Sequence, residues 1–371
     1  MAPHQSWISY FSNLVKEYGG INLAQGVPGF SPPSDLLDIL HQTAAQPVHQ
    51  YAPGPGNKQL REHIYNMYQH KINREETSLM VCNGATEAIH LLYMSFHEPN
   101  RKLKAAAFAP VYESYLHLPR LYGDMFQSLE MLNDEAEMQR HLEDFFEAYR
   151  PDVFFVNSPG NPHGFVLKKA LFDKLIDLSV HYGCQVIIDA VYDKLCFNGE
   201  AYYPYDNFYP NVFYVNSFSK LYSITGWRIG YFFCHHSRYN RISDIHDYTG
   251  LSVPSVLQES LARFISDSMQ ATRYVKETKT KLSENYKLGT AMLTRAGFDV
   301  PETGGGYFIW AKLPENIPDG IDFAKTMYEK YKTAVIPGEH FGKDYNRYIR
   351  INIARDNKEL KNGLMYICSL T

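Results

Sequence analysis

The sequence predicts an α/β protein with a large domain, whose mostly parallel sheet carries helices on both faces, and a smaller α+β domain. Three observations predict this. Short β-branched and aromatic runs alternate with amphipathic helix-length segments between residues 78 and 234, which is typical of βαβ units on a buried parallel sheet. From about residue 254, long helices and sparse strands replace this alternation. The 371 residues also exceed the ~250–300 that one core usually holds.

Strand-like runs follow one another in the first part of the chain. They are SLMVCNG (78–84), KAAAFAP (104–110), PDVFFVNSP (151–159), CQVIIDAVY (184–192), NVFYVNSFS (211–219) and WRIGYFFC (227–234). Amphipathic segments such as ATEAIHLLYMSF and KKALFDKLIDLSVHYG separate several of them. Ligands of such sheets bind outside the carboxyl ends of the strands, so we expect the site among the polar residues that end these runs.

The last part of the chain reads differently. Long helices are expected from VPSVLQESLARFISDSM through the charged stretch that ends near Arg295, and a last helix in DNKELKNGLMYICSL. Between them lie the strand-like runs GGGYFIWAKL, TAVIPG and RYIRINIA. We therefore expect a large domain at 47–265 and a small α+β domain formed by 1–46 and 266–371, with the long helix bridging the two.

The composition excludes several classes of function. The formal net charge is −4 and no run of Lys and Arg exceeds two residues, so we expect no binding to nucleic acid or to an anionic membrane. No signal peptide and no stretch of 18 uncharged apolar residues is visible. The cysteines at 82, 184, 196, 234 and 368 are odd in number and form no C-x-x-C pair. We therefore expect reduced thiols that fill the core of a cytoplasmic protein, with no disulfide and no metal site.

The turn after the first strand-like run can bind an anion. In VCNGATEAI, Gly84 makes the turn between strand and helix, and the N–H groups of Ala85 and Thr86 open the helix. Free N–H groups and the positive end of the helix dipole attract a phosphate. A turn that only caps the helix is the alternative.

The stretch NSFSKLYSITGWRIGYF adds further anion-binding groups. Ser217 and Ser219 end one strand-like run, and Arg228 is expected at the start of the next. A guanidinium is a forked, permanently charged donor. The apolar neighbours of Arg228 predict that it is shielded from solvent and faces an anion, whereas a partly exposed ion pair is the alternative.

A carboxylate and a lysine complete one ligand site. Asp189 ends a strongly apolar run and therefore needs a cationic or N–H partner; a pyridinium nitrogen would suit it, and a structural ion pair is the alternative. Tyr192 follows three residues later. Lys220, set among desolvating groups near Arg228, is expected to have a lowered pKa that suits Schiff-base chemistry with an aldehyde. The phosphate groups, the carboxylate and the lysine together indicate pyridoxal 5′-phosphate.

The chain resembles the fold-type-I pyridoxal-phosphate aminotransferases of class I/II, in particular the branch of the methionine, glutamine/phenylpyruvate and kynurenine transaminases. The resemblance covers nearly the whole length. It is carried, in the order of that family, by INLAQGVPGFSPP, QYAPGPGNKQLRE, NGATEAI, PVYESY, NSPGNPHG, DAVYDKL, SFSKLYSITGWRIGY and YIRINIA.

The resemblance implies roles for single residues on the cofactor. Lys220 would form the Schiff base and Asp189 would pair with the pyridine nitrogen. The ring would also be contacted by Tyr112, on its face, and by Asn161 and Tyr192, at its phenolic oxygen. The phosphate would be held by Ala85, Thr86, Ser217 and Arg228, with Gly84 and Ser219 also counted among the cofactor-binding residues.

Further implied roles concern the substrate and a second subunit. Arg350 would fork onto the α-carboxylate of an amino acid, helped by Asn161 and the backbone of Gly26. The alternation in RYIRINIA agrees, because it turns Arg350 away from the isoleucines. Tyr51 would reach the phosphate of the neighbouring subunit, so we expect a homodimer.

The expected reaction is a ping-pong Schiff-base transamination between an amino acid and a 2-oxo acid. Aromatic residues near the site, and no second arginine in an obvious pocket motif, favour large neutral donors such as methionine, aromatic amino acids, kynurenine or glutamine. A C–S β-lyase or a decarboxylase on the same fold would share the cofactor residues. A ligand-sensing regulator is disfavoured, because only 20 residues precede INLAQG.

Overall fold

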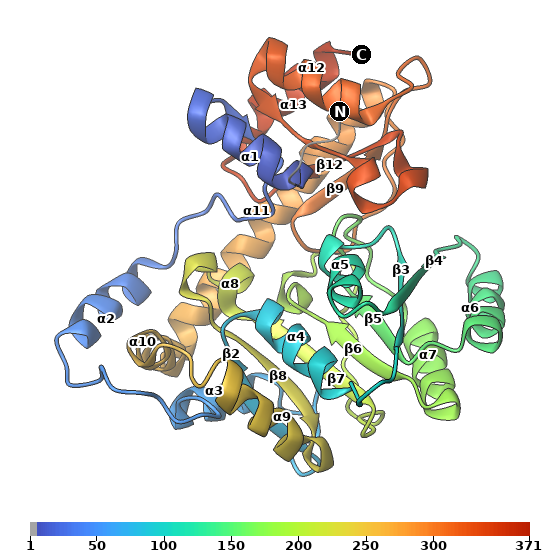
Figure 1. The fold of residues 1–371 in the computed structure, drawn as a ribbon. Helices are drawn as coiled ribbons and strands as arrows, with labels where there is room; N and C mark the ends of the chain where they lie inside the picture. Colours follow the sequence, from blue (N-terminus) through green and yellow to red (C-terminus); the bar gives the residue numbers. More distant parts are fainter. Residues whose placement is uncertain (1–5) are drawn as a thin grey trace.

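The computed structural model describes residues 6–371, and its largest feature is a seven-stranded sheet (Figure 1). Its strands, in spatial order, are β2 (Thr77–Cys82), β8 (Gly230–His235), β7 (Val212–Ser217), β6 (Gln185–Asp189), β5 (Val153–Asn157), β3 (Lys104–Ala109) and β4 (Met125–Glu130). β8 is antiparallel to both of its neighbours, and the other pairs are parallel. The α/β fold class predicted from the sequence is confirmed.

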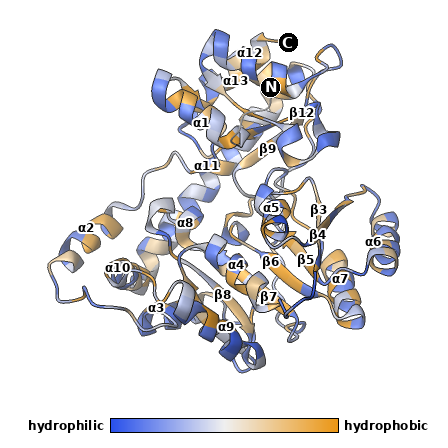
Figure 2. Ribbon diagram, viewed as in Figure 1, coloured by the Kyte–Doolittle hydropathy of each residue, from blue (hydrophilic) through white to orange (hydrophobic). Residues whose placement is uncertain are grey.

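The central strands are hydrophobic without interruption because both faces of the sheet are covered (Figure 2). In β5, Val153 and Phe155 belong to one core, and Phe154 and Val156 to the core on the opposite face. This is the two-residue period of a strand with two buried faces. The sheet is therefore held rigidly between layers, and polar groups gather at the ends of its strands.

Helices form these two layers (Figure 1). One core contains side chains of α4 (Ala85–Ser95), α5 (Glu113–Leu121) and α9 (His236–Thr249). The other contains side chains of α3 (Lys58–Met67), α6 (Glu135–Tyr149), α7 (Lys169–Tyr182) and α10 (Ser255–Ser266). The short helix α8 (Phe218–Leu221) follows β7 directly.

A second body contains the first and last helices of the described chain (Figure 1). Its antiparallel sheet has the order β11 (Ile336–Pro337), β12 (Tyr348–Asn352) and β9 (Phe308–Lys312), and a parallel pair joins β1 (Ile21–Asn22) to β10 (Thr333–Ala334). Its helices are α1 (Trp7–Tyr18), α12 (Gly320–Tyr331) and α13 (Asn357–Ser369). The helix α11 (Ser268–Arg295) runs from α10 to this body.

The helix α2 (Ser34–Ala44) packs against α10, which belongs to one of the two helix layers on the seven-stranded sheet. The division into 47–265 and two flanking segments stays a prediction. No helix in the described part of the chain is both long and apolar enough to cross a membrane.

Two strand predictions need correction. The run WRIGYFFC does not start its strand at Trp227, because Thr225–Trp227 form a 3₁₀ turn and Arg228 takes a left-handed conformation, with φ 54°. The strand begins at Gly230, whose missing side chain lets it lie against the turn at Gly84; a Cβ there would be 2.4 Å from the carbonyl carbon of Gly84. The run TAVIPG is not one strand either, since β10 and β11 belong to different sheets.

Candidate active site

A cavity of about 490 Å³ lies at the carboxyl ends of β5, β6 and β7, beneath β12. Most of the residues predicted for the site line it. They are Gly26, Ala85, Thr86, Tyr112, Asn161, Asp189, Tyr192, Ser217, Ser219, Lys220, Arg228 and Arg350. Two predicted residues do not: Gly84 forms the turn behind the wall, and Tyr51 is 84% exposed outside the cavity.

Lys220 is placed by a short helix that Ser217 caps, since the Ser217 hydroxyl accepts from the Ser219 N–H at 3.1 Å. Its Nζ donates to the carbonyl of Gly26 at 2.5 Å. Burial, and then the charges of Arg350 and Arg228, lower the pKa of Lys220 to about 8, although Asp189 works in the other direction. The lowered pKa predicted from the sequence is thus found, and its main electrostatic cause is Arg350 rather than Arg228.

Asp189 is the last residue of β6 and is only 5% exposed. The hydroxyl of Tyr115 donates to Oδ2 at 2.5 Å, and the N–H of Val191 donates to Oδ1 at 3.3 Å. Burial raises the pKa of Asp189 to about 6 despite these bonds and the nearby Lys220. The carboxylate is therefore short of positive charge inside the chain itself. The role of Tyr115 could not be predicted from the sequence, because its bond to Asp189 spans 74 residues.

The turn at Gly84 has the features of an anion site. Gly84 begins α4 with φ 84° and no side chain caps the helix, so the first N–H groups of α4 are free to bind an anion. The Arg228 guanidinium lies over the turn, because a Cβ on Gly84 would be 2.3 Å from its Nη2. Its Nη1 donates to the carbonyl of Thr225 at 3.0 Å and its Nη2 to the carbonyl of Asn83 at 3.3 Å.

Arg228 is exposed, so the expectation that its apolar neighbours shield it is wrong. The left-handed turn at residue 228 is the physical reason, since it directs the side chain away from the core that Ile229 enters. The hydroxyl of Ser217 donates to the Ile229 carbonyl at 2.9 Å, and its oxygen lies 2.8 Å from Ser219 Oγ, which can donate to it.

Arg350 is fully buried in β12. Its Nη1 donates to Asn161 Oδ1 at 2.8 Å and its Nη2 to the Ala24 carbonyl at 2.5 Å. The guanidinium also lies over the ring of Phe308, 4.3 Å from the centroid. Burial lowers its pKa to about 10, so it stays charged at neutral pH. Nη1 and Nη2 each carry a second N–H, which leaves part of the fork available to a ligand.

The remaining ring-facing candidates surround the same space. Tyr112 precedes α5 and Tyr192 follows β6, and burial raises the pKa of both phenols. Asn161 is fixed by its own N–H, which donates to Asn157 Oδ1 at 2.6 Å. All three side chains are thus neutral donors or acceptors at the cavity wall.

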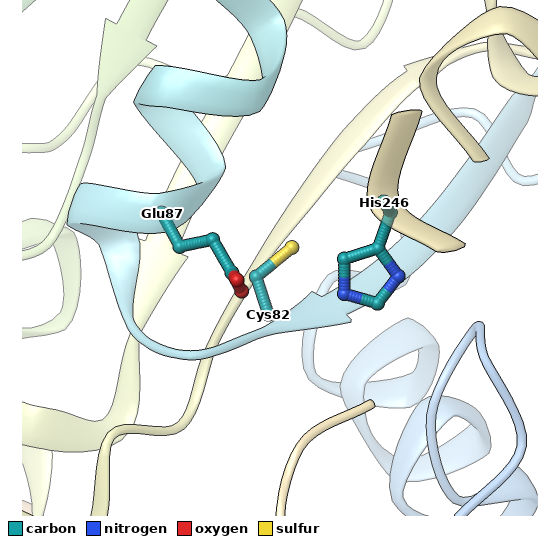
Figure 3. Close-up of side chains that lie close together, drawn as sticks. All are labelled: Cys82, Glu87 and His246. Atoms are coloured by element: carbon teal, nitrogen blue, oxygen red, sulfur yellow. The ribbon is translucent and has the colours of Figure 1, made fainter. Parts of the chain in front are cut away.

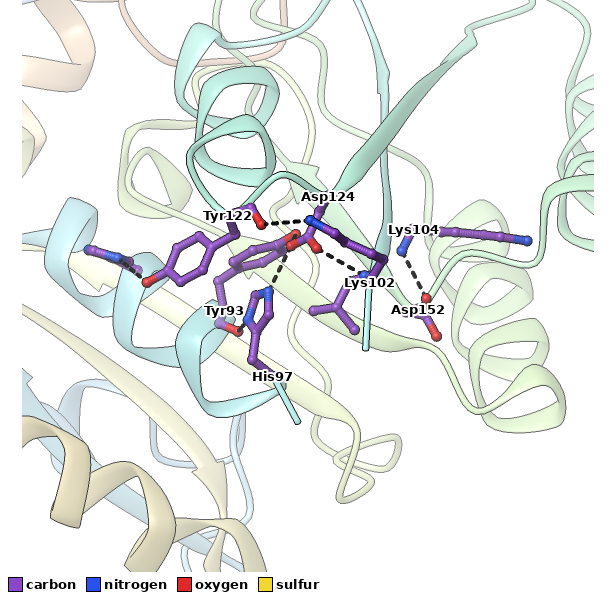
Figure 4. A network of polar contacts seen from close by, with 9 residues as sticks. Tyr93, His97, Lys102, Lys104, Tyr122, Asp124 and Asp152 are labelled. Atoms are coloured by element: carbon purple, nitrogen blue, oxygen red, sulfur yellow. Dashed lines mark hydrogen bonds and ion pairs between the residues drawn. The ribbon is translucent and has the colours of Figure 1, made fainter. Parts of the chain in front are cut away.

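A polar network behind the wall was not found from the sequence (Figure 4). His90 lines the cavity, and its Nε2 lies 2.7 Å from the hydroxyl oxygen of Tyr122. Asp124 accepts from the Tyr93 hydroxyl at 2.7 Å and lies 2.7 Å from His97 Nε2. The partners of Asp124 are 27 and 31 residues away in sequence, and no local pattern indicates such pairs.

The donor set fits pyridoxal phosphate. A buried carboxylate short of positive charge suits a pyridinium nitrogen, and a lysine with a pKa of about 8 suits an aldehyde. An uncapped helix start beside an arginine suits a phosphate. The fold and this cavity define a pyridoxal-phosphate enzyme of fold type I.

Comparison with known proteins agrees. The family described as aminotransferase class I and II matches residues 18–367. An aspartate aminotransferase of Pyrococcus abyssi is 25% identical over 353 residues, which cover 93% of this chain and 90% of that protein. An aromatic-amino-acid aminotransferase of Thermococcus litoralis is 22% identical over 355 residues, with 93% and 90% covered.

Solved structures share the fold. The N-succinyldiaminopimelate aminotransferase of Mycobacterium tuberculosis superimposes with a TM-score of 0.89 at 24% identity, covering 99% of this chain and 98% of that one. The chain therefore belongs to the class I and II aminotransferases, a family that depends on pyridoxal phosphate.

Proposed function

We propose that this aminotransferase moves the amino group of a large neutral L-amino acid, of the methionine, aromatic, kynurenine or glutamine type, to a 2-oxo acid. The observation that carries the proposal is a carboxylate, that of Glu113, in the cavity wall. Apolar side chains form much of the same wall: Ile8, Val27, Ile89, Leu118 and Leu121.

Glu113 disfavours a second carboxylate on the substrate. Burial raises the pKa of Glu113, but the hydrogen bond and charge of His340, with smaller effects of His117 and Arg350, outweigh burial and hold the pKa below its usual value. The group is therefore ionised at neutral pH, so an acidic side chain in the cavity would meet a negative charge, which His340 partly offsets because its Nε2 lies 3.1 Å from Glu113 Oε2. Among the described residues that line the cavity, the arginines are Arg228 and Arg350. In the proposal, Arg228 binds the phosphate and Arg350 binds the α-carboxylate, so neither is left to bind an acidic side chain.

On the cofactor side, we assign Asp189 to the pyridine nitrogen and Tyr112, Asn161 and Tyr192 to the ring. The phosphate is assigned to the turn at Gly84, Ala85 and Thr86 together with Ser217, Ser219 and Arg228. When bound, pyridoxal phosphate supplies an aldehyde that condenses with amines and a ring that withdraws electrons from the substrate's Cα. The rigid strands β6 and β7 hold the assigned side chains in place.

On the substrate side, Arg350 binds the α-carboxylate through its planar fork, and Asn161 orients that fork. Lys220 holds or moves a proton at Nζ, because an amine with a pKa near 8 exists in both states around neutral pH. The carbonyl of Gly26 accepts from the same Nζ, so it fixes the amine between cofactor and substrate positions. The body that contains β12 forms part of the cavity wall through Arg350.

We also propose a homodimer, in which Tyr51 reaches the phosphate of the other subunit. Its ring is among the most exposed large side chains of the described residues, which suits a residue that a second copy covers. Sedimentation of the active enzyme tests this, and an active monomer would contradict it. The cytoplasmic location expected from the cysteines stays a prediction.

The substrate proposal is tested with a panel of amino donors and two acceptors, 2-oxoglutarate and phenylpyruvate. We expect kcat/KM for methionine, phenylalanine, tyrosine, kynurenine or glutamine to exceed that for aspartate by at least ~10-fold, which corresponds to about 1.4 kcal/mol. Exclusive use of aspartate would refute the proposal.

Glu113 itself gives a sharper test. Glu113→Gln removes the repelling charge and should raise kcat/KM for aspartate relative to methionine by roughly 5- to 10-fold, since the interaction is partly solvated. Glu137→Gln, on α6 and outside the cavity lining, is the matched control. An unchanged ratio in Glu113→Gln would show that this carboxylate does not select the substrate.

A further inference from the structure

Three side chains that can bind a metal ion converge behind the turn at Gly84 (Figure 3). Cys82 ends β2, Glu87 lies in the first turn of α4, and His246 lies near the end of α9. A sulfur, a carboxylate oxygen and a ring nitrogen, one from each, all lie within 4.8 Å of one another. Three elements of one helix–sheet layer therefore meet at a set of mixed S, O and N ligands.

The imidazole of His246 has no partner of its own. The residue is fully buried, and neither ring nitrogen makes a hydrogen bond to any residue in the described range 6–371. A buried polar group without a partner costs about 1–3 kcal/mol, so most such groups in native proteins have one. A ligand that accepts a nitrogen lone pair would satisfy the ring, and Figure 3 shows the ring beside Cys82 and Glu87.

The Glu87 carboxylate is held in place by Asn83, whose Nδ2 donates to Oε1 at 3.3 Å and to Oε2 at 3.2 Å. Oε2 of Glu87 accepts from the N–H of Asn83 at 2.5 Å, so the carboxylate is anchored. A Cβ on Gly250 would lie 2.3 Å from Glu87 Oε1 and 3.2 Å from His246 Nε2. The space between these two atoms therefore exists because residue 250 has no side chain, although its φ of −112° suits any residue.

We propose that Cys82, Glu87 and His246 bind one Zn²⁺ ion, with a water molecule as the fourth ligand. Zinc is bound by thiolate, imidazole and carboxylate ligands and often by three protein ligands plus water, and thiolate with imidazole favours zinc over harder ions. Zinc–ligand bonds of about 2.0–2.3 Å place ligand atoms roughly 3–4 Å apart, so a small movement of the side chains completes the site.

Charge balance favours a divalent ion. A thiolate and a carboxylate together neutralise Zn²⁺, which removes most of the cost of burying a charge. On binding, the Cys82 thiol gives up its proton to solvent and its sulfur bonds to the metal, with no change of oxidation state. This proposal differs from the prediction made from the sequence, where the scattered cysteines indicated no metal site.

The ion would brace the turn that we assign to the phosphate. Asn83, Gly84, Ala85 and Thr86 lie between the ligands Cys82 and Glu87, so zinc would fix both ends of this turn and tie it to α9. Bound zinc should therefore raise the melting temperature of the protein, whatever its amino donor is.

The test uses the purified full chain loaded with zinc and then dialysed, followed by metal analysis. We expect one zinc per chain. Replacement by Co²⁺ should give ligand-field bands in the visible range and thiolate-to-cobalt absorption, a signature that adventitious surface binding would not produce.

Variants assign the site. Cys82→Ser and His246→Gln should bind zinc more weakly by at least ~10–100-fold, the loss found when only supporting residues of a site are removed. Cys184→Ser, a buried cysteine elsewhere in the chain, should bind zinc as the unmodified protein does. Gly250→Ala keeps all three ligands and a compatible backbone but puts a methyl group between them, so it should also lose zinc.

Each result decides the proposal. Unmodified protein without stoichiometric zinc, or without thiolate-to-cobalt absorption, overturns it. So does Gly250→Ala that binds zinc with unchanged affinity. If Cys82→Ser fails to fold, Gly250→Ala and His246→Gln still decide, with the zinc-induced rise in melting temperature as the second measurement.

Discussion

Asp189 and Asp193 are two buried aspartates in one short stretch of chain, and they are held in different ways. They are 5% and 4% exposed. Asp189 ends β6, faces the cavity and has one side-chain donor, the Tyr115 hydroxyl. Asp193 starts the 3₁₀ turn Asp193–Leu195, away from the cavity lining.

Asp193 is satisfied within the chain. Oδ2 accepts from the hydroxyls of Tyr68 at 2.8 Å and Tyr214 at 3.0 Å, and Oδ1 accepts from the N–H of Lys194 at 2.6 Å. Tyr68 in turn accepts from Asn216 Nδ2 at 2.8 Å. A complete network of this kind stabilises a core.

Asp189 lacks such a network, and its pKa is raised to about 6. Equal burial of the same residue type thus has opposite consequences. The carboxylate of Asp193 has its hydrogen bonds within the chain and stabilises the fold. The carboxylate of Asp189 lacks a strong cationic partner within the chain and is available to a cationic ligand.

The contrast is tested most strongly on the lysines that accompany the two aspartates. Burial is the main reason that the pKa of both Lys220 and Lys194 is lowered to about 8. Of these two lysines, only Lys220 lines the cavity. Lys220→Ala should lower kcat by at least ~10⁴-fold and remove the absorbance of the bound cofactor. Lys194→Ala is the matched control and should retain both. An active Lys220→Ala would overturn the assignment.

Asp189→Asn is expected to have the next largest effect. It removes the charge that a pyridinium would meet, so kcat/KM should fall by roughly 10²–10⁴-fold, which corresponds to a lost buried ion pair of 3–5 kcal/mol.

The same substitution should stabilise the cofactor-free protein. The folded pKa of about 6 lies above the usual 3.8, so stability from Asp189 is present below pH ~4 and is lost as the pH rises through 6. At pH 7 the change should add roughly 3 kcal/mol to the free energy of unfolding, measured in urea. A loss of stability would contradict the contrast.

Asp193→Asn should show the reverse. It breaks charge-assisted hydrogen bonds from Tyr68 and Tyr214, so the free energy of unfolding should fall by about 2–4 kcal/mol. The folded enzyme should keep its kcat, because this network lies outside the cavity lining. Stability and activity measured on the same preparations separate the two aspartates.

The smallest expected effect is a shift of a pH profile. In the cofactor-free protein, the rate of labelling of Lys220 by an amine-reactive reagent should rise tenfold per pH unit and level off above about pH 8. Arg350 is the largest electrostatic cause of this pKa, so Arg350→Met should move the midpoint upward. Arg347→Met, just before the same strand, should leave it in place. A midpoint unmoved by Arg350→Met would mean that burial alone sets the pKa.

Much of the fold and of the candidate active site could be predicted from the sequence. The alternating runs predicted the sheet, because a strand buried on both faces is hydrophobic without interruption. The polar residues that end those runs predicted the cavity, since the carboxyl ends of parallel strands meet at one edge. Asp189, Lys220 and Arg350 were identified in this way and by resemblance.

What escaped prediction depends on long-range packing. The left-handed turn at Arg228 leads into the close contact of Gly230 with Gly84, which is distant in the sequence. The bond of Tyr115 to Asp189 and the approach of His246 to Cys82 join segments that are distant in the sequence. Local patterns contain no information on such pairs.

The fastening of Arg350 to the Ala24 carbonyl, across 326 residues, has a consequence for how the protein is made. On the ribosome, residues 85–228 emerge and can assemble long before β12 exists, whereas the N-terminal segment has to wait for the last part of the chain. A nascent chain would therefore contain the residues assigned to the cofactor before it contains Arg350, which is assigned to the amino acid. Cofactor present during synthesis could then bind before the substrate side of the cavity has formed.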